Sequence, residues 1–347
     1  MKQTEITKIQ KLLDENGNIA QPGYAKKLLW EYNRENVTAS KALLKEWDYY
    51  YIGNDKCAVC LTIADMGYIG ALSATVLDFE EVWQVTGSSV ILFPMGKLHL
   101  PRTSVVGDSK YKNGAVEMTF LNDGTKRRIY GKYPKLGKNG ETLSFDVTLG
   151  DVPEESMVIA TPFDKKGRFY YNQKINCMSA NGSFSFGDKK YVLNKENGAQ
   201  ATLDWGRGVW TYDNTWYWGS LQTTLEDGKT FGFNVGYGFG NNTEATENML
   251  FYGGKSHKID EVTFNIPKDA DGNDDYMSPW TFTSNDGRFY MDFTPIIDRY
   301  EPVDLKVFCM IPHQVFGKFS GKAVLDDGTV IEIHDKLGFA EKVHNKW

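Results

Sequence analysis

Residues 201–248 read ATLDWGRGVWTYDNTWYWGSLQTTLEDGKTFGFNVGYGFGNNTEATEN, a pattern that is typical of curled β-sheet. Aromatic and β-branched residues, which favour strands, come here in short runs. Glycines interrupt these runs, and a glycine inside a strand often marks a bulge, a bend or the close approach of another group. The segment also holds four of the nine tryptophans of the chain, at positions 205, 210, 216 and 218. It therefore predicts strands that carry an unusual concentration of large aromatic side chains.

Charged and polar side chains stand among these aromatic residues. Asp204 and Arg207 lie in the first run, and Glu247 and Asn248 close the segment. Aromatic side chains normally drive burial, whereas burying an unpaired charge is costly. Two interpretations follow: an aromatic-walled pocket with a few polar groups aimed inward, or a β-core closed by an ion pair between Asp204 and Arg207.

The same pattern extends outward from this segment over most of the chain. From residue 46 to the end, strand-like runs such as CAVCLTIA, LSFDVTL and LKVFCMI are separated by turn signals such as Asn122-Asp123-Gly124 and Asp326-Asp327-Gly328. Helix-length periodic segments do not alternate with these runs, which argues against a doubly wound α/β fold. We expect a mainly all-β protein of about 18–20 antiparallel strands, closed as two barrels or sandwiches in tandem.

The chain divides into three parts. A short helical lead is expected over residues 1–40, because Ala25–Tyr32 follows Pro22 and Gly23 and can form one apolar face. The polar, turn-rich segment Asn194–Gly198 suggests a boundary, so that a first β-domain spans residues 41–200 and a second spans residues 201–347. The tryptophan-rich segment then lies at the junction of the two domains, which is a common place for ligand pockets.

Composition and net charge limit the possible binding partners and the cellular location of the protein. The 347 residues carry a net charge of -6, which gives no support to a nucleic-acid partner, since such proteins usually show a basic patch. The N-terminus is polar and lacks the apolar region of a secretory signal. No apolar run approaches the roughly 20 residues of a membrane-spanning helix. We expect a cytoplasmic protein with no membrane span.

Cysteines and histidines give no metal pattern. Cys57 and Cys60 have CxxC spacing, but they lie in an apolar, strand-like run without a second pair of ligands, so free buried thiols are expected. None of the five histidines forms an HxH or HExxH pair, and no cofactor is expected. His257 is the best acid–base candidate among them because it follows Glu247 by a hairpin; the alternative is a surface histidine at the start of a strand.

Motifs along nearly the whole chain resemble the bacterial domain-of-unknown-function family 2804. The motifs, in chain order, are Lys45–Tyr50, Ile63–Tyr68, Asp204–Trp210, Trp216–Trp218, Gly232–Asn234, Gly238–Gly240, Glu244–Asn248, His257–Asp260, Pro279–Trp280, Gly287–Arg288, His313–Gly317, Glu341 and Trp347. The family name assigns no function.

A more distant resemblance is to the carotenoid 1,2-hydratase and AttH-like proteins. The runs that carry it are Tyr170–Gln173, Ser179–Ser183 and Leu203–Trp205. It implies paired lipocalin-like β-barrels, and chemistry such as the addition or removal of water on apolar, unsaturated substrates. It also implies that Asp204 is the proton donor. The chain departs from these relatives directly after Asp204, where Trp205-Gly206-Arg207 stands in place of a His-Glu-Trp pattern.

Acid–base chemistry needs a carboxylic acid that keeps its proton near neutral pH. Tryptophan walls would raise the pKa of Asp204 by excluding water, whereas the Arg207 guanidinium would lower it. If Asp204 and Arg207 form a structural pair, Glu247 is the titrating group. The expected substrate-binding residues are Trp205, Arg207, Trp210, Trp216, Trp218, Asn234 and Asn248, and the expected catalytic residues are Asp204, Glu247 and His257.

Three functions therefore compete. The first is a cofactor-independent hydratase, dehydratase or isomerase that acts on a hydrophobic unsaturated small molecule. The second is a carrier that binds a lipid or isoprenoid in the same pocket without chemistry. The third is a carbohydrate-active protein, which a pair of carboxyl groups across an open groove would favour.

Overall fold

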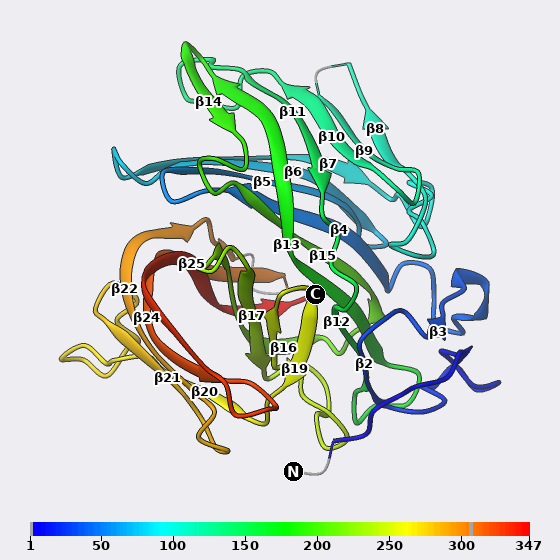
Figure 1. Cartoon of the computed structure of the whole chain (residues 1–347). Helices are drawn as coiled ribbons and strands as arrows, with labels where there is room; N and C mark the ends of the chain where they lie inside the picture. Colours follow the sequence, from blue (N-terminus) through cyan, green and yellow to red (C-terminus); the bar gives the residue numbers. More distant parts are fainter. Residues whose placement is uncertain (1–2, 115, 305–307) are drawn as a thin grey trace.

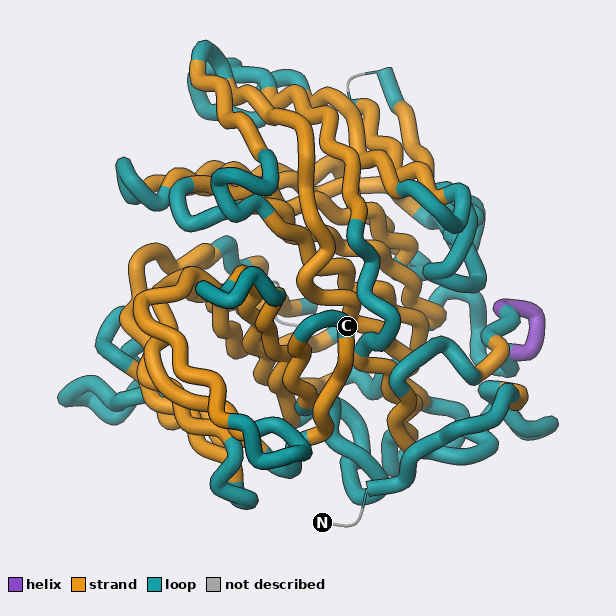
Figure 2. The backbone as a smooth tube through the Cα atoms, viewed as in Figure 1, coloured by secondary structure: helices purple, strands orange, loops and turns teal. Residues whose placement is uncertain are grey.

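The computed structural model describes residues 3–114, 116–304 and 308–347, and nearly all of its regular structure is β-sheet (Figures 1 and 2). Within these residues, the 3-10 helix η1 (Arg34–Asn36) is the helical exception. The strands form a sheet of 13 strands and a sheet of 10 strands, and two further short strands pair with each other. The prediction of a mainly all-β protein with two curled antiparallel units in tandem is confirmed.

The first sheet contains β2 (Gly23–Ala25), β4 (Leu44–Gly53), β5 (Cys57–Asp65), β6 (Ile69–Asp78), β7 (Trp83–Leu92), β8 (Ser109–Lys112), β9 (Glu117–Asn122), β10 (Arg127–Tyr133), β11 (Leu143–Gly150), β12 (Met157–Pro162), β13 (Phe169–Phe186), β14 (Lys189–Leu193) and β15 (Gln200–Val209). Its main path runs in the order β7-β6-β5-β4-β15-β13-β11-β10-β9-β8. The separate pair is β1 (Gln10–Lys11) with β3 (Trp30–Glu31).

The second sheet contains β16 (Asp213–Thr224), β17 (Thr230–Tyr237), β18 (Met249–Tyr252), β19 (Lys255–Lys258), β20 (Val262–Asn265), β21 (Trp280–Ser284), β22 (Phe289–Tyr300), β23 (Val303–Asp304), β24 (Cys309–Val324) and β25 (Val330–Lys346). Its main path runs in the order β19-β18-β17-β16-β25-β24-β22-β21-β20.

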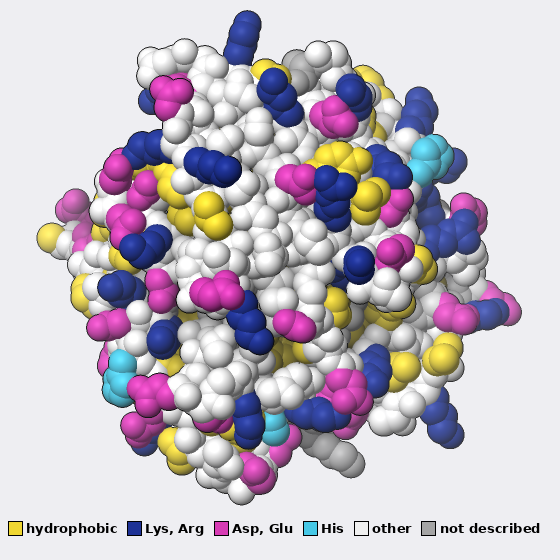
Figure 3. Space-filling model, turned by 45° about the horizontal axis from the view of Figure 1, so that its top comes forward, with side chains coloured by type: hydrophobic (Ala, Val, Ile, Leu, Met, Phe, Trp, Pro, Cys, Tyr) yellow, Lys and Arg dark blue, Asp and Glu magenta, His cyan; other side chains and the backbone are white. Residues whose placement is uncertain are grey.

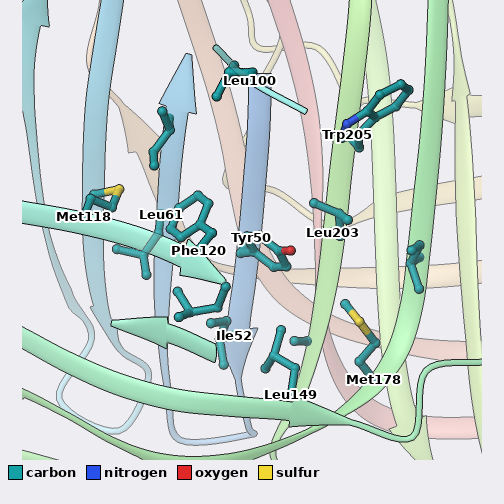
Figure 4. Close-up of a cluster of buried hydrophobic side chains, with 14 of the residues drawn as sticks. Tyr50, Ile52, Leu61, Leu100, Met118, Phe120, Leu149, Met178, Leu203 and Trp205 are labelled. Carbon is teal, nitrogen blue, oxygen red and sulfur yellow. The ribbon is translucent and has the colours of Figure 1, made fainter. Parts of the chain in front are cut away.

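Each sheet curls around a hydrophobic core of its own. In the first sheet, the rings of Tyr50 on β4 and Phe120 on β9 lie 5.1 Å apart, although several strands separate them along the sheet. Figure 4 shows these two rings meeting in the first core. In the second sheet, Phe233 on β17 lies 5.0 Å from Phe289 on β22 in the same way. The pleat sends alternate side chains of each strand into this enclosed core.

A third cluster of buried aromatic side chains lies between the two sheets, where their outer faces meet. Tyr51 on β4 lies 5.7 Å from Phe339 on β25, and Tyr49 lies 5.9 Å from Trp218 on β16. Strand β4 is therefore buried on both faces along its whole length. The junction of the two sheets is a packed interface, and Figure 1 shows the sheets lying one above the other.

The expectation of a helical lead over residues 1–40 is wrong. Ala25 ends strand β2, Trp30 begins β3, and no helix lies between them. Trp30 and Tyr32 are both buried against the first core. These two residues are spaced by two, as in a strand, and tertiary burial outweighs the weak helical pattern of this segment.

The chain crosses from the first sheet to the second at a later residue than the sequence predicts. The predicted boundary lies between residues 200 and 201, but β15 pairs with β4 and β13 and so belongs to the first sheet. The second sheet begins at Asp213. The turn signal at Asn194–Gly198 marks the connection from β14 to β15 within the first sheet. We propose Trp210–Tyr212 as the domain boundary.

The surface mixes charges of both signs. On the face in Figure 3, lysine and arginine side chains are interspersed with aspartate and glutamate, and neither sign gathers into a broad field. Among the described residues, no helix has the length and apolar character needed to cross a membrane.

Substitution of Gly206 by alanine should destabilise the protein, because a Cβ at this position would overlap the indole ring of Trp47. Forcing a methyl group into a packed interface typically costs about 1–3 kcal/mol. Urea unfolding followed by circular dichroism measures the loss. Gly114→Ala is the matched control, since a Cβ there meets nothing within 4 Å. Equal stability of the two variants would contradict this packing.

Candidate functional site

A cavity of about 330 Å³ lies between the two sheets. This volume is near the lower end of the range for small-molecule sites. Its walls come from the outer face of the first sheet, through β4, β5, β6, β7, β13 and β15, and from the outer face of the second sheet, through β16, β22, β24 and β25. The cavity is thus a product of the way the two units pack.

The register of the first sheet lines up a row of polar side chains along its wall of the cavity. Residues that pair across neighbouring strands project from the same face of a sheet. The row, in strand order from β13 to β7, is Lys174, Asp204, Tyr49, Thr62, Ser73 and Ser88. Lys174, Asp204 and Tyr49 are buried, whereas Ser88 is exposed. The row therefore runs from a closed end at β13 to an open end at β7.

The second sheet presents a matching row on the opposite wall. Its members are Trp218 on β16, Glu341 on β25, Gln314 on β24 and Arg299 on β22. Glu247 extends the row by one strand, because a Cβ on Gly236, the residue paired with Trp218, would come within 2.8 Å of its Oε1. Burial again decreases along the row: Glu341 and Gln314 are buried and Arg299 is half-buried.

Contacts at both ends show that the two rows face each other. At the closed end, Lys174 Nζ lies 3.9 Å from the ring centre of Trp218. At the open end, Arg299 Nη1 donates a hydrogen bond of 3.2 Å to Thr75 Oγ1 on β6. Apolar side chains flank both rows; they are Trp47, Ala64, Ala71 and Val90 on the first sheet and Trp216, Pro312 and Val343 on the second.

An ion pair closes the inner end of the cavity. Lys174 Nζ lies 2.7 Å from Asp204 Oδ2, and Asn172 Nδ2 donates a hydrogen bond of 2.6 Å to Asp204 Oδ1. Both charged side chains are buried. The partner of Asp204 is therefore Lys174, and the interpretation of an Asp204–Arg207 pair is wrong.

Glu247 lies beside this ion pair and has few partners of its own. Burial raises the pKa of its carboxyl group, and the nearby Lys174 ammonium and a hydrogen bond from Asn234 only partly oppose that rise. The hydrogen bond from Asn234 Nδ2 to Glu247 Oε2 is long, at 3.3 Å. This carboxyl group therefore keeps its proton to a higher pH than an ordinary glutamate does.

Glu341 is a second buried carboxyl group on the same wall, and burial raises its pKa as well. Unlike Glu247, it has both oxygens occupied: Trp216 Nε1 donates to Oε1 and Gln314 Nε2 donates to Oε2, each at 2.8 Å. These donors, with the charges of Arg299 and Lys174, partly oppose the rise in pKa.

Half of the predicted site residues meet at the cavity. Asp204 and Glu247 lie at its closed end, and Trp210, Trp216 and Trp218 form part of its walls. Their roles toward a ligand remain proposals.

Trp205 and Arg207 lie on the other side of β15, away from the cavity, and are buried in the first sheet. Arg207 Nη2 lies 3.0 Å from Asp48 Oδ1, and its Nη1 donates a hydrogen bond of 2.7 Å to the Trp47 carbonyl. Neither Trp205 nor Arg207 lines the cavity. The pleat explains this, because successive side chains of a strand point to opposite faces.

The two asparagines that were expected to bind substrate, Asn234 and Asn248, form hydrogen bonds that hold the segment carrying Glu247. Asn234 accepts a hydrogen bond of 2.7 Å from Trp218 Nε1 and donates one of 2.9 Å to the Glu247 carbonyl. Asn248 accepts from the backbone N–H of Gly236 at 2.7 Å. Both side chains are fully buried and hold the segment that carries Glu247.

His257 lies apart from the cavity. It is half-buried on β19, and its Nδ1 lies 3.3 Å from Asp326 Oδ2. The hairpin from β18 to β19 carries it away from Glu247. No group of three or more histidine, cysteine, aspartate or glutamate residues in the described part of the chain is arranged to hold a metal ion.

Sequence reasoning did not predict several residues of the cavity. Lys174 and Arg299 belong to no motif of the sequence, and Tyr49, Gln314 and Glu341 fall only within the motifs that carry the family resemblance. No motif links these positions, which come from β4, β13, β22, β24 and β25. The alternation of β25 is the one signal that could have helped, since Glu341 interrupts a buried apolar run.

Comparison with known proteins places the chain in a family. The model of DUF2804, a domain of unknown function, matches residues 3–347, so the chain belongs to this family. No protein of curated function matches the sequence.

Two solved structures resemble the chain in fold. Kievitone hydratase from Nectria haematococca has a TM-score of 0.52 and 10% sequence identity, over 97% of this chain and 98% of its own. A protein described as AttH from Nitrosomonas europaea has a TM-score of 0.45 and 11% identity, over 90% of this chain and 95% of its own.

Replacing Lys174 by methionine should destabilise the protein by about 3–5 kcal/mol, because it leaves the buried Asp204 carboxylate without its partner. The double variant Lys174→Met/Asp204→Asn should recover most of this loss, since no buried charge then lacks a partner. Urea unfolding measures both.

Lys110→Met is the matched control for this prediction. Lys110 forms an ion pair of the same length, 2.7 Å, with Asp108, but at the surface. Exposed pairs contribute little to stability. If Lys174→Met proved as mild as Lys110→Met, the pair at the closed end would not carry the stability assigned to it.

Proposed function

We propose that this member of the DUF2804 family is a cofactor-independent acid–base enzyme of the hydratase, dehydratase or isomerase type, acting on a largely apolar, unsaturated small molecule. One observation carries the proposal: a carboxylic acid with a raised pKa, Glu247, is buried at the closed end of an aromatic cavity. Such an acid can protonate a carbon–carbon double bond, and perturbed carboxyl groups in a cavity mark candidate active sites.

Glu247 is the proton donor in this proposal. Its single long hydrogen bond from Asn234 leaves its acidic proton free to be given away. Glu341 is less suited to this step because two donors already occupy its oxygens. Asp204, the donor that the distant resemblance implies, is held by Lys174 and Asn172.

The hydration step balances with water as the only co-reactant. The π electrons of the alkene form a new bond to the Glu247 proton, which leaves a carbocation on the other carbon. A water oxygen then bonds to that carbon and gives up one proton to the Glu247 carboxylate, so the acid is restored. Dehydration is the same sequence in reverse. Isomerisation returns a proton from a neighbouring carbon in place of the water step.

The aromatic walls suit the charged intermediate. Trp210, Trp216 and Phe239 lie within 4.9–6.1 Å of one another around the cavity. Ring faces attract cations, and a site without bulk water strengthens that attraction. The ring of Trp218 already faces the Lys174 ammonium, so the other rings remain for the substrate.

The fold gives additional support of a general kind. The structure from Nectria haematococca that shares it is named a hydratase, so this arrangement of two sheets accommodates that chemistry. A shared fold does not assign a function by itself, and the proposal therefore rests on the site. The mostly apolar walls favour this substrate class over a carbohydrate.

Glu247→Gln should lower turnover about 10²- to 10⁴-fold, the usual contribution of a general acid. Native mass spectrometry first identifies co-purifying small molecules, and these and unsaturated isoprenoids are then incubated in ¹⁸O-labelled water. Mass spectrometry follows the gain of one labelled water. The rate of the unmodified enzyme should fall as the pH rises, because only the protonated form of Glu247 donates.

Glu244→Gln is the control, because Glu244 lies in the same loop but is exposed. It should keep full activity. If Glu247→Gln retained the activity of Glu244→Gln, Glu247 would not be the acid. Ligand binding without turnover in all variants would favour the alternative of a lipid or isoprenoid carrier.

A further inference from the structure

We propose that Arg299 binds an anionic head group at the open end of the cavity, so that the substrate is an elongated amphiphile whose apolar, unsaturated end reaches the carboxyl groups at the closed end. The inference rests on the proposed function and deepens it by naming the substrate class. The shared chemistry of the head group is that of a carboxylate or a phosphate monoester.

The Arg299 guanidinium has more N–H groups than its hydrogen bond to Thr75 uses. It lines the cavity, it is half-buried, and its Nη1 donates to the Thr75 hydroxyl. It forms no ion pair with any carboxylate in the ranges that the structure describes, although its charge acts on Glu341 across the wall. The remaining N–H groups of a guanidinium form a planar fork that matches a carboxylate or a phosphate.

The position of Arg299 in the row fixes where that anion lies. Arg299 on β22 and Gly236 on β17, which Glu247 Oε1 approaches, stand at opposite ends of the row on the second sheet, separated by four strand spacings. Neighbouring strands lie about 4.8 Å apart, so the two backbone positions are roughly 19 Å apart along the sheet. A molecule anchored at Arg299 therefore has to be elongated to reach Glu247.

Burial along the walls agrees with this orientation. Lys174, Asp204 and Glu247 at the closed end are buried, whereas Ser88 and Val90 at the open end are exposed. A charged head group keeps part of its hydration at the open end, and the apolar tail fills the dry end. The opposite orientation would bury an anion beside the Asp204 carboxylate, where Lys174 is already paired, and burying an unpaired charge is costly.

Gln314 gives independent evidence that a polar group of the ligand binds between the two ends of the cavity. Its Oε1 is buried and has no hydrogen-bond partner among the described residues, while its Nε2 donates to Glu341. Asn345 also lines the cavity and is fully buried, and within the same residues neither polar atom of its amide has a partner. Buried polar groups are normally paired, so these atoms are placed to meet a ligand or bound water.

The test uses farnesoate, its methyl ester and farnesyl monophosphate as probes, with binding followed by the fluorescence of the tryptophans that line the cavity. The intact protein should bind farnesoate about 10- to 100-fold more tightly than the ester, the range expected for a charge-assisted hydrogen bond. Arg299→Gln should reduce farnesoate binding to the level of the ester and leave ester binding unchanged. Arg299→Lys should restore part of the preference. Tighter binding of the phosphate than of farnesoate would identify a phosphate head group, and the reverse a carboxylate.

Arg128→Gln is the matched control, because Arg128 forms an exposed pair with Asp146 on the first sheet, outside the cavity. It should keep the preference for the acid. The inference is overturned if the intact protein does not distinguish acid from ester, or if Arg299→Gln weakens both equally. Failure of the proposed function is distinguishable, since an active Glu247→Gln variant would remove the proposed acid and leave the preference for the anion intact.

Discussion

Strand β15 is buried on both faces, and this constraint organises the whole molecule. Its two neighbours, β4 and β13, are likewise covered by the first core on one side and by the second sheet on the other. Each residue of these strands therefore enters one of two different environments according to its parity. Arg207 enters the first core, whereas Asp204 enters the cavity between the sheets. A shift of one residue in register would exchange the two and would leave both without partners.

Charged side chains are paired differently on the two faces of these strands. In the first core, the Arg207 guanidinium is fully enclosed, and it donates to three backbone carbonyls and to Asp48. Both terminal nitrogens of this guanidinium are therefore committed to the protein, and its Nε lies 3.7 Å from Glu46 Oε1. At the cavity, Asp204 and Glu341 are well paired, while Glu247 accepts one long side-chain hydrogen bond from the described residues. Among the three carboxyl groups of the cavity wall, Glu247 thus has the most unused hydrogen-bonding capacity.

The sequence was sufficient for the fold class and for part of the site. Alternating apolar runs predicted an all-β chain, and the tryptophans at 210, 216 and 218 do line the cavity. The proposed Asp204–Arg207 pair was avoidable, because residues three apart in a strand point to opposite faces. The pairing of Lys174 with Asp204 was not predictable, since it depends on the register between β13 and β15, which shifts at a bulge between Ile175 and Met178. The rows that bring Arg299, Gln314 and Glu341 together are likewise set by long-range register and by no local motif.

Burial and the nearby charges at the closed end account for the raised pKa of Glu247. Lys174 is the one ammonium group in contact with Asp204, and the distance of 2.7 Å commits it to that carboxylate. Both charges act on Glu247: the Lys174 ammonium lowers the pKa of its carboxyl group, and the Asp204 carboxylate raises it. Burial outweighs the opposing charges of Lys174 and Lys258, so the pKa of Glu247 is raised above its ordinary value. The raised pKa of Glu247 thus follows from its burial between the two sheets, beside a lysine that is already paired with Asp204.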